Sequence, residues 1–381
     1  MKTYHLICNA HLDPIWLWTW EEGAAEAIST FRVAADLCEA FDAFVFNHNE
    51  VVLYEWVEEY EPELFERIRA LVKAGKWHIM GGWYLQPDCN MPSGEGFVRQ
   101  ILVGKRYFMQ KFGVEPATAI NFDPFGHSRG LVQIMAKSGY DSYLFGRPDE
   151  GHCPLDDNPF WWVGFDGSRI LARRHAVGYN SRLGHVDEKV ERVMRESDQP
   201  DIDCILWGVG NHGGGPSTVD LEKLDRIVEE SSDRLVHSTP EGYFAELRKC
   251  RGDDFGERAA DINPWAQGCY TSQIRIKQGL RRLENDVFLT EKMCAAASSQ
   301  NLMSYPAGEL RPAIVDMCFT HFHDILPGSS IQPAERDALR RIDRGLDICS
   351  QLKTRAFFAL ASGQEKAGEN VVPVLVYNPH P

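Results

Sequence analysis

No stretch of this 381-residue sequence approaches the roughly 18 consecutive apolar residues that a membrane-spanning helix requires. Positive charge is also scarce, because 40 lysines and arginines stand against 55 aspartates and glutamates, a formal net charge of −15. This balance argues against nucleic acid or an anionic membrane as the main partner. The amino terminus carries one lysine and lacks the apolar core of a secretory signal, so we expect a cytoplasmic protein.

Paired cysteines are missing as well. The ten cysteines are scattered and form no CxxC pair, which argues against zinc-finger ligands and predicts small buried hydrophobic residues. Hydrophobic residues at 44% and charged residues at 25% indicate a globular protein rather than a disordered one. The length exceeds one ordinary core, so we expect two domains, or one large barrel with an appendage.

Short apolar runs alternate with segments of helical periodicity over the first 250 or so residues. The apolar runs are 4–9, 44–47, 77–81, 117–123, 142–146, 169–175 and 203–208. The helical segments are 26–41, 62–74, 94–112, 131–138, 187–195, 220–229 and 241–250. This alternation predicts a parallel sheet with helices outside it, either a closed barrel or a doubly wound sheet. Six or seven strands, rather than eight, favour an irregular β/α barrel over residues 1–262.

A polar linker at residues 251–264 ends this pattern, and almost no strand signal follows it until the end of the chain. Three amphipathic helical segments predict a three-helix bundle domain over residues 263–365. Residues 366–381 contain VVPVLVYNPHP, which is typical of a first strand. We interpret this segment as the start of a C-terminal β-sandwich region that the chain lacks.

Polar residues follow the predicted strands. His11 and Asp13 come directly after the run YHLICN, at the strand end where α/β folds place their chemistry. Later strand ends carry further polar side chains: Asn47, His48, Asn49, Glu50, Asp88, Asn90, Asp123, His127, Arg147, Asp149, Glu150, Asn211 and His212. Convergence of such groups predicts an active site at one end of the barrel.

Asp123 is the carboxylate of greatest interest, because Pro124 biases its backbone toward an extended conformation at a strand end. Asp13 precedes a proline in the same way, although Asp-Pro pairs also commonly start turns. His323 lies far downstream before a Pro-Gly break, where a capping or interior histidine is the alternative. Together His11, Asp13, Asp123 and His323 would supply two nitrogens and two carboxylates, a set that suits zinc.

Six motifs occur in order along the chain: HLDPIWLW, GGWYLQPDCNMPSGE, NFDPFGHS, GNHGGGPS, YTSQIRIKQGLRRLE and HFHDILPGSS. In these motifs the sequence resembles the glycoside hydrolase family 38 α-mannosidases, and the bacterial cytoplasmic branch more than the Golgi or lysosomal enzymes. The resemblance runs from His11 to the final VYNPHP and therefore spans almost the whole chain.

The resemblance implies a seven-stranded parallel β/α barrel, then a three-helix bundle that contributes His323, then β domains. It implies one zinc ion on His11, Asp13, Asp123 and His323. Asp123 would be the nucleophile that forms a covalent mannosyl-enzyme, with retention of configuration. The substrate-binding residues expected within or beside these motifs are Trp16, Asp88, Phe125, Arg147, Tyr270 and Asp324. Trp16 and Phe125 would offer flat walls to sugar faces, and plain core aromatics are the alternative for both.

The sequence departs from the family where many members carry the acid that protonates the leaving oxygen. Here the motif reads GVGNHGGGPS, which offers Asn211 and His212. An amide is a poor proton donor, so we favour His212 as the acid, with Asp88 as the second candidate.

Three functional hypotheses follow. The first is a zinc-dependent retaining α-mannosidase acting on small oligosaccharides, with no nucleic-acid or membrane partner and with a homo-oligomer left open. The second is a zinc-dependent polysaccharide deacetylase, which also combines an irregular β/α barrel with histidine and aspartate ligands. The third is a non-catalytic sugar-binding remnant, suggested by Asn211 and the short C-terminus.

Overall fold

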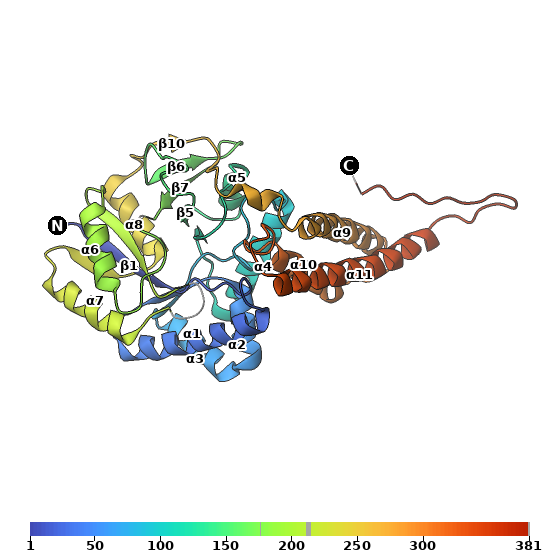
Figure 1. Cartoon of the computed structure of the whole chain (residues 1–381). Coiled ribbons are helices and arrows are strands. Elements are labelled where there is room, and N and C mark those ends of the chain that lie inside the picture. Colours follow the sequence, from blue (N-terminus) through green and yellow to red (C-terminus); the bar gives the residue numbers. More distant parts are fainter. Residues whose placement is uncertain (176, 211–214, 380–381) are drawn as a thin grey trace.

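Strands and helices alternate through the first two thirds of the chain, and helices dominate the remainder (Figure 1). The computed structural model describes residues 1–175, 177–210 and 215–379. The strands are β1 (Thr3–Asn9), β2 (Phe46–His48), β3 (Trp77–Ile79), β4 (Thr118–Asn121), β5 (Ser142–Phe145), β6 (Phe160–Val163), β7 (Arg169–Arg174), β8 (Ile202–Trp207), β9 (Arg234–His237) and β10 (Glu257–Arg258). The helices are α1 (Trp20–Ala40), α2 (Val51–Tyr60), α3 (Pro62–Lys73), α4 (Gly94–Phe112), α5 (Gly130–Lys137), α6 (Val186–Glu196), α7 (Thr218–Glu230), α8 (Pro240–Arg251), α9 (Ile274–Ser299), α10 (Ala307–Thr320) and α11 (Gln332–Ser362).

The strands form two five-stranded sheets. One has the order β3-β2-β1-β8, with β9 also paired to β1, and all of its pairs are parallel. The other has the order β10-β6-β7-β5-β4 and is parallel except for the β6–β7 pair. The predicted α/β class with parallel sheets is confirmed. Among the described residues no ladder joins the two sheets, so closure into one seven-stranded barrel stays a prediction.

Strand β1 lies inside its sheet and is buried on both faces. Every residue of β1 after Thr3 is buried, as expected of a parallel strand that is covered on both faces. Its residues pair with β8 along most of their length, while Cys8 and Asn9 pair with β2. The carboxyl end of β1 therefore delivers the following residues into the interior of the molecule.

Several elements differ from the sequence-based expectation. Strands β6, β9 and β10 and helix α2 were not predicted, and α1 begins six residues earlier than the predicted helix 26–41. Other helices agree closely, and α4 matches residues 94–112. It begins where the Ser93 hydroxyl accepts a hydrogen bond from the backbone N–H of Gly96 and ends at Gly113 with a φ of 70°.

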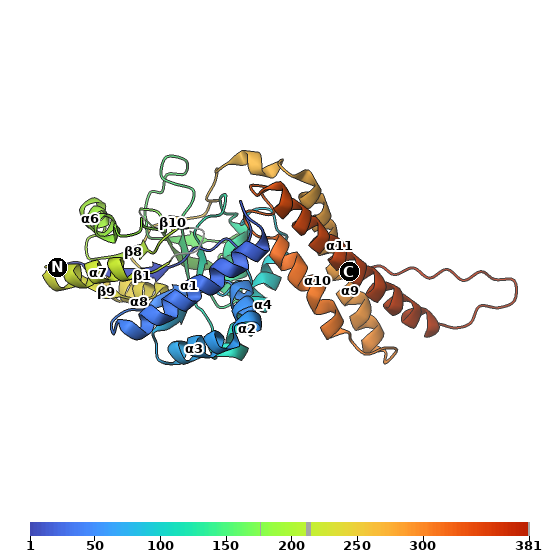
Figure 2. The same cartoon turned by 60° about the horizontal axis from the view of Figure 1, so that its bottom comes forward.

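The helices α9, α10 and α11 pack against one another, and α10 also contacts α4. Both views show these three helices side by side, projecting from one side of the sheets (Figure 2). The predicted boundaries at residues 262 and 365 stay predictions. Residues 366–379 turn at Glu369 and Asn370, and none of them belongs to a described strand. No helix in the described part of the chain is both long and apolar enough to cross a membrane.

Candidate active site

His11 and Asp13 lie just beyond the carboxyl end of β1 and are almost completely buried, with 3% and 4% of their surfaces exposed. His11 Nε2 is 2.9 Å from Asp13 Oδ1. The loop that carries them is held by the Trp18 indole N–H, which donates to the Asp13 carbonyl at 2.9 Å. The Trp16 and Trp18 rings meet edge to face at 5.5 Å, so Trp16 packs on the residue that anchors Asp13.

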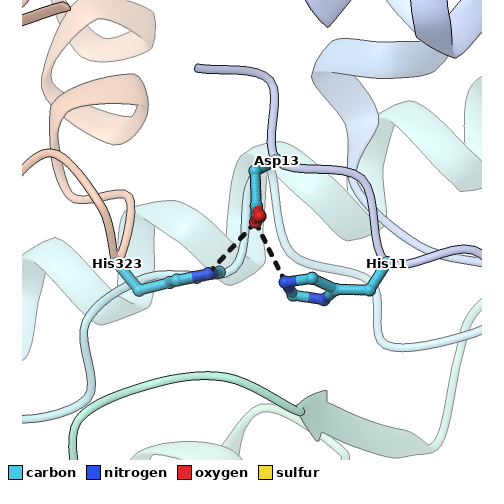
Figure 3. Close-up of side chains that lie close together, drawn as sticks. All are labelled: His11, Asp13 and His323. Carbon is cyan, nitrogen blue, oxygen red and sulfur yellow. Dashed lines mark ion pairs between the residues drawn. The ribbon is translucent and has the colours of Figure 1, made fainter. Parts of the chain in front are cut away.

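His323 approaches the same carboxylate from the segment after α10. Its Nδ1 lies 3.1 Å from the Gln86 carbonyl, and its Nε2 lies 3.3 Å from Asp13 Oδ1. A carbonyl only accepts hydrogen bonds, so Nδ1 carries the hydrogen and a neutral ring keeps its lone pair on Nε2. Figure 3 shows Asp13 between the two imidazoles, with a dashed line to each.

The three side chains have the composition and geometry of a metal site. One ligand atom from each of His11, Asp13 and His323 lies within 4.8 Å of the others, and all three residues are buried. Despite their proximity, Asp13 Oδ1 and both Nε2 atoms lack a hydrogen bond of acceptable geometry. Buried polar atoms without partners are costly, and a divalent cation would satisfy all three together. Two imidazoles and a carboxylate are a donor set that zinc accepts.

Asp123 follows β4 and points to a different partner. Its Oδ1 pairs with Arg147 Nη2 at 2.9 Å, and the Arg147 guanidinium lies 5.9 Å from the Phe125 ring and 5.6 Å from the Trp265 ring. Asp123 is not among the three clustered side chains. The structure therefore brings together His11, Asp13 and His323, and Asp123 as the fourth ligand stays a prediction.

The pKa values of the clustered residues are shifted by burial and by several neighbouring carboxylates. Burial lowers the pKa of His323, but Asp13, Asp324 and Asp123 outweigh it and raise that pKa to about 9. His11 behaves similarly, since Asp13 overcomes the effect of burial and raises its pKa. Burial disfavours the charge on Asp13, yet the two histidines hold its pKa well below the usual range. A site that draws protons in this way also attracts a cation.

Two further carboxyl groups lie nearby with altered acidity. Burial and the charge of Asp13 raise the pKa of Asp324 to about 7, while the Ser329 hydroxyl donates to one of its oxygens. Burial also raises the pKa of Glu50 to about 7. Asp324 Oδ2 is 3.9 Å from His323 Nε2, which places it at the edge of the cluster.

The other predicted residues occupy varied positions. Asp88 is fully buried, and one of its oxygens accepts from the backbone N–H groups of Asn90 and Met91 at 3.0 and 2.7 Å. Its other oxygen has no partner, and burial raises its pKa. Tyr270 is 36% exposed and accepts a hydrogen bond from Asn90 at 2.9 Å. His212, with its neighbour Asn211, lies outside the described residues.

Tyr179 was not expected at the site, yet its ring centroid lies 4.6 Å from that of His11. Its loop follows β7 and is held by several donors. Lys189 Nζ donates to the carbonyls of Gly178 and Asn180 at 2.9 and 2.6 Å, and Asn9 donates to the Tyr179 carbonyl at 3.1 Å. No motif marks this segment, because its position depends on contacts that only the fold creates.

A cleft of about 1180 Å³ adjoins the cluster. Arg147, which pairs with Asp123, and Tyr179, which packs on His11, both line it, whereas the three clustered side chains do not. The rest of its wall includes acidic and amide groups and the Trp265 ring. The cleft therefore connects the solvent to the side of the site where Asp123 and Arg147 lie.

The family models and the curated relatives that match this chain point to one family. A model described as the glycosyl hydrolases family 38 N-terminal domain matches residues 1–268, and one described as the alpha mannosidase middle domain matches residues 265–360. Alpha-mannosidase G of Dictyostelium discoideum is 30% identical over 364 residues, which cover 91% of this chain and 32% of that protein. Alpha-mannosidase 2C1 of Homo sapiens is 30% identical over 376 residues, which cover 95% of this chain and 35% of that protein.

An alpha-mannosidase from Enterococcus faecalis V583 has a similar fold, with a TM-score of 0.83 at 22% identity. The match covers 95% of this chain and 43% of that one. The chain spans about a third of the length of the two curated relatives described above.

Proposed function

This chain belongs to glycosyl hydrolase family 38, and we propose that it is a zinc-dependent retaining α-mannosidase that removes terminal α-mannosyl residues from small oligosaccharides. The observation that carries the proposal is the buried His11, Asp13 and His323 cluster, whose unpartnered ligand atoms lie beside the Asp123–Arg147 pair. The cytoplasmic location and the lack of a nucleic-acid or membrane partner belong to the same proposal.

His11, Asp13 and His323 would hold the zinc ion, with Asp123 as the predicted fourth ligand. Bound there, zinc would supply a Lewis acid for the hydroxyl groups of the sugar. The remaining chemistry falls to the side chains of the chain. Arg147 Nη2 lies 2.9 Å from Asp123 Oδ1, and this ion pair would help to orient the carboxylate of the nucleophile.

The proposed reaction proceeds in two displacements at the anomeric carbon. Asp123 forms a bond to that carbon as the glycosidic C–O bond breaks, and a general acid donates a proton to the leaving oxygen. The conjugate base of that acid then takes a proton from water, which attacks the anomeric carbon from the face that the leaving oxygen vacated. The bond to Asp123 breaks, so the α configuration is retained. His212 remains our preferred acid, and Asp88 is the alternative, because its unpartnered oxygen and raised pKa suit a protonated carboxyl group.

The finer fold belongs to the proposal as well. We expect the two sheets to form an irregular seven-stranded barrel over residues 1–262, and α9, α10 and α11 to form a three-helix bundle over residues 263–365. Parallel pairing in both sheets and the mutual packing of these helices support this arrangement. His323 would then be the contribution of the bundle to the site.

The test is turnover of an aryl α-mannoside by the purified protein. Activity should disappear when a chelator is added and return when zinc is restored. In a separate experiment, a mechanism-based fluorinated mannosyl reagent should form a covalent adduct on Asp123. An active, zinc-dependent protein that forms no adduct at Asp123 would overturn the retaining mechanism.

The second candidate function is a zinc-dependent polysaccharide deacetylase. The observation that favours it is that Asp123 lies outside the three-residue cluster, where it could act as a base instead of a ligand. Such an enzyme releases acetate from an N-acetylated polysaccharide and does not form a glycosyl adduct. Measuring acetate release alongside the trapping experiment separates the two, and failure of both leaves the sugar-binding hypothesis.

A further inference from the structure

One buried glutamine links the segments that carry the site. Gln86, 1% exposed, follows β3, and its carbonyl faces both Nδ1 and the backbone N–H of His323 at 3.1 and 3.3 Å. Its side-chain oxygen accepts from the backbone N–H of Phe122 at 2.9 Å. Phe122 immediately precedes Asp123, so Gln86 contacts the backbone beside the proposed nucleophile as well as a proposed metal ligand.

Glu50 determines how the Gln86 amide is oriented. The Gln86 Nε2 group donates to Glu50 Oε1 at 2.8 Å. A backbone N–H only donates, so the Gln86 oxygen must face Phe122, and its amide hydrogens then face Glu50 Oε1, which accepts. With Glu50 on one side and Phe122 on the other, only one of the two amide orientations makes both hydrogen bonds.

The backbone of Glu50 is itself unusual. Its φ of 71° lies in the left-handed region that residues other than glycine rarely occupy. It is 1% exposed, and its Oε2 has no hydrogen-bond partner. A strained backbone that holds an incompletely satisfied carboxyl group in the interior persists where the surroundings fix it, and such residues cluster at functional sites.

We propose that Glu50 and Gln86 are positioning residues of the active site, which hold the Asp123 backbone and the His323 ring in one fixed relation. Neither side chain touches the three clustered ligand atoms. Loss of the Glu50 acceptor would leave the Gln86 Nε2 group buried without its partner and remove one of the two hydrogen bonds that hold the amide. Loss of the Gln86 side chain would leave the Phe122 N–H without its acceptor. The Asp123 backbone and the Gln86 carbonyl beneath His323 would then shift relative to each other. This inference rests on the proposed function for its catalytic part.

The test uses methionine as a substitute of similar length without strong hydrogen-bonding groups. Gln86→Met and Glu50→Met are compared with Glu50→Gln, which keeps an oxygen that accepts from Gln86. The matched control is Thr118→Val at the opposite end of β4, where the Thr118 and Ser142 hydroxyls share a buried 2.8 Å hydrogen bond. Each variant is assayed for zinc affinity by competition with a chelator, and for amide exchange of residues 119–125 without metal.

We expect Gln86→Met and Glu50→Met to weaken zinc binding roughly 10- to 100-fold, the usual effect of losing support behind a ligand. Their Phe122 amide should exchange faster in the metal-free protein. Glu50→Gln should restore both properties, and Thr118→Val should leave zinc affinity unchanged.

Folded Gln86→Met with wild-type zinc affinity and exchange would overturn the proposal. Equal loss of zinc in Thr118→Val would also overturn it, since the effect would then be one of general stability. Aryl α-mannoside turnover is measured in parallel. A wild-type protein that binds zinc and lacks turnover would refute the mannosidase function, while the zinc and exchange results would still decide the positioning role.

Discussion

Two buried histidine–carboxylate pairs lie close together in this molecule and differ in one respect. His321 Nε2 is 2.9 Å from Glu284 Oε1, which also accepts from the Ser93 N–H, while Arg281 donates to the other Glu284 oxygen. The His323–Asp13 pair has the same chemistry, yet its facing atoms lack acceptable hydrogen bonds. The facing atoms of the first pair are satisfied by other protein groups, whereas those of the second pair would need a bound cation to satisfy them. We therefore interpret the His321–Glu284 pair as a structural contact of α9, called the latch below, and the His323–Asp13 pair as part of a candidate metal centre.

The largest expected effect is on kcat, and it compares Asp123 of the proposed active site with Glu284 of the latch. Asp123→Ala should lower kcat for an aryl α-mannoside by about four orders of magnitude, because the proposed nucleophile is lost. Glu284→Gln keeps the shape of the latch and should leave kcat within about tenfold of wild type, or 1.4 kcal/mol in barrier height. Comparable kcat losses in both variants would contradict the distinction.

Replacement of His321 and replacement of His323 should affect different properties of the protein. His321→Ala removes one of three partners of the buried Glu284 and should lower the free energy of unfolding by about 1–3 kcal/mol, with zinc still bound by the folded fraction. His323→Ala should mainly lower zinc content. Denaturant titration and metal analysis of both variants provide the comparison, and full zinc occupancy in His323→Ala would show that His323 is not a ligand.

Removal of the metal should change the thermal stability of variants of the two pairs to different extents. A ligand held at a thousand times its dissociation constant adds about 4 kcal/mol to the free energy of unfolding. Chelation should therefore lower the melting temperature of the wild type and of Glu284→Gln, and should change that of His323→Ala much less. Equal shifts in all three proteins would place the stabilising ion elsewhere.

The smallest effect concerns pH. The pKa of His323, raised to about 9 in the folded metal-free protein, exceeds the value of about 6.5 expected in the unfolded chain. Its protonation therefore stabilises the fold fully below about pH 6.5, and this contribution is lost as the pH rises through about 9. Zinc must displace that proton, so zinc affinity should rise by about tenfold per pH unit in this window. His323→Ala should flatten both dependences.

The amino-terminal half of the site could be predicted because its signal is local. An apolar run that ends in His11 and Asp13 indicates a buried strand with chemistry at its carboxyl end, and β1 ends immediately before that segment, at Asn9. His323 follows a helix, where nothing in the neighbouring residues shows that it lies over β1. Its residue type made it a candidate ligand, with a capping or interior histidine as the alternative, and the family resemblance then implied the role of a ligand.

Other features could not be predicted, because they arise from tertiary contacts. The antiparallel β6–β7 pair interrupts the regular strand and helix alternation, and β10 is only two residues long. Gln86 lies within the motif GGWYLQPDCNMPSGE, but its positioning role depends on hydrogen bonds to Phe122 and Glu50, which only the fold brings to it. The left-handed backbone of Glu50 likewise has no signature in its residue type.

The origin of the three clustered side chains has a consequence for biosynthesis. Residues 11 and 13 are made early, whereas residue 323 is made only after the strands that the structure describes and after α10. If the proposed zinc site is correct, a nascent chain has no complete site until His323 has been synthesised and has reached Asp13. Metal uptake would then report that translation and folding have both passed this point, and unfinished chains would not retain the ion.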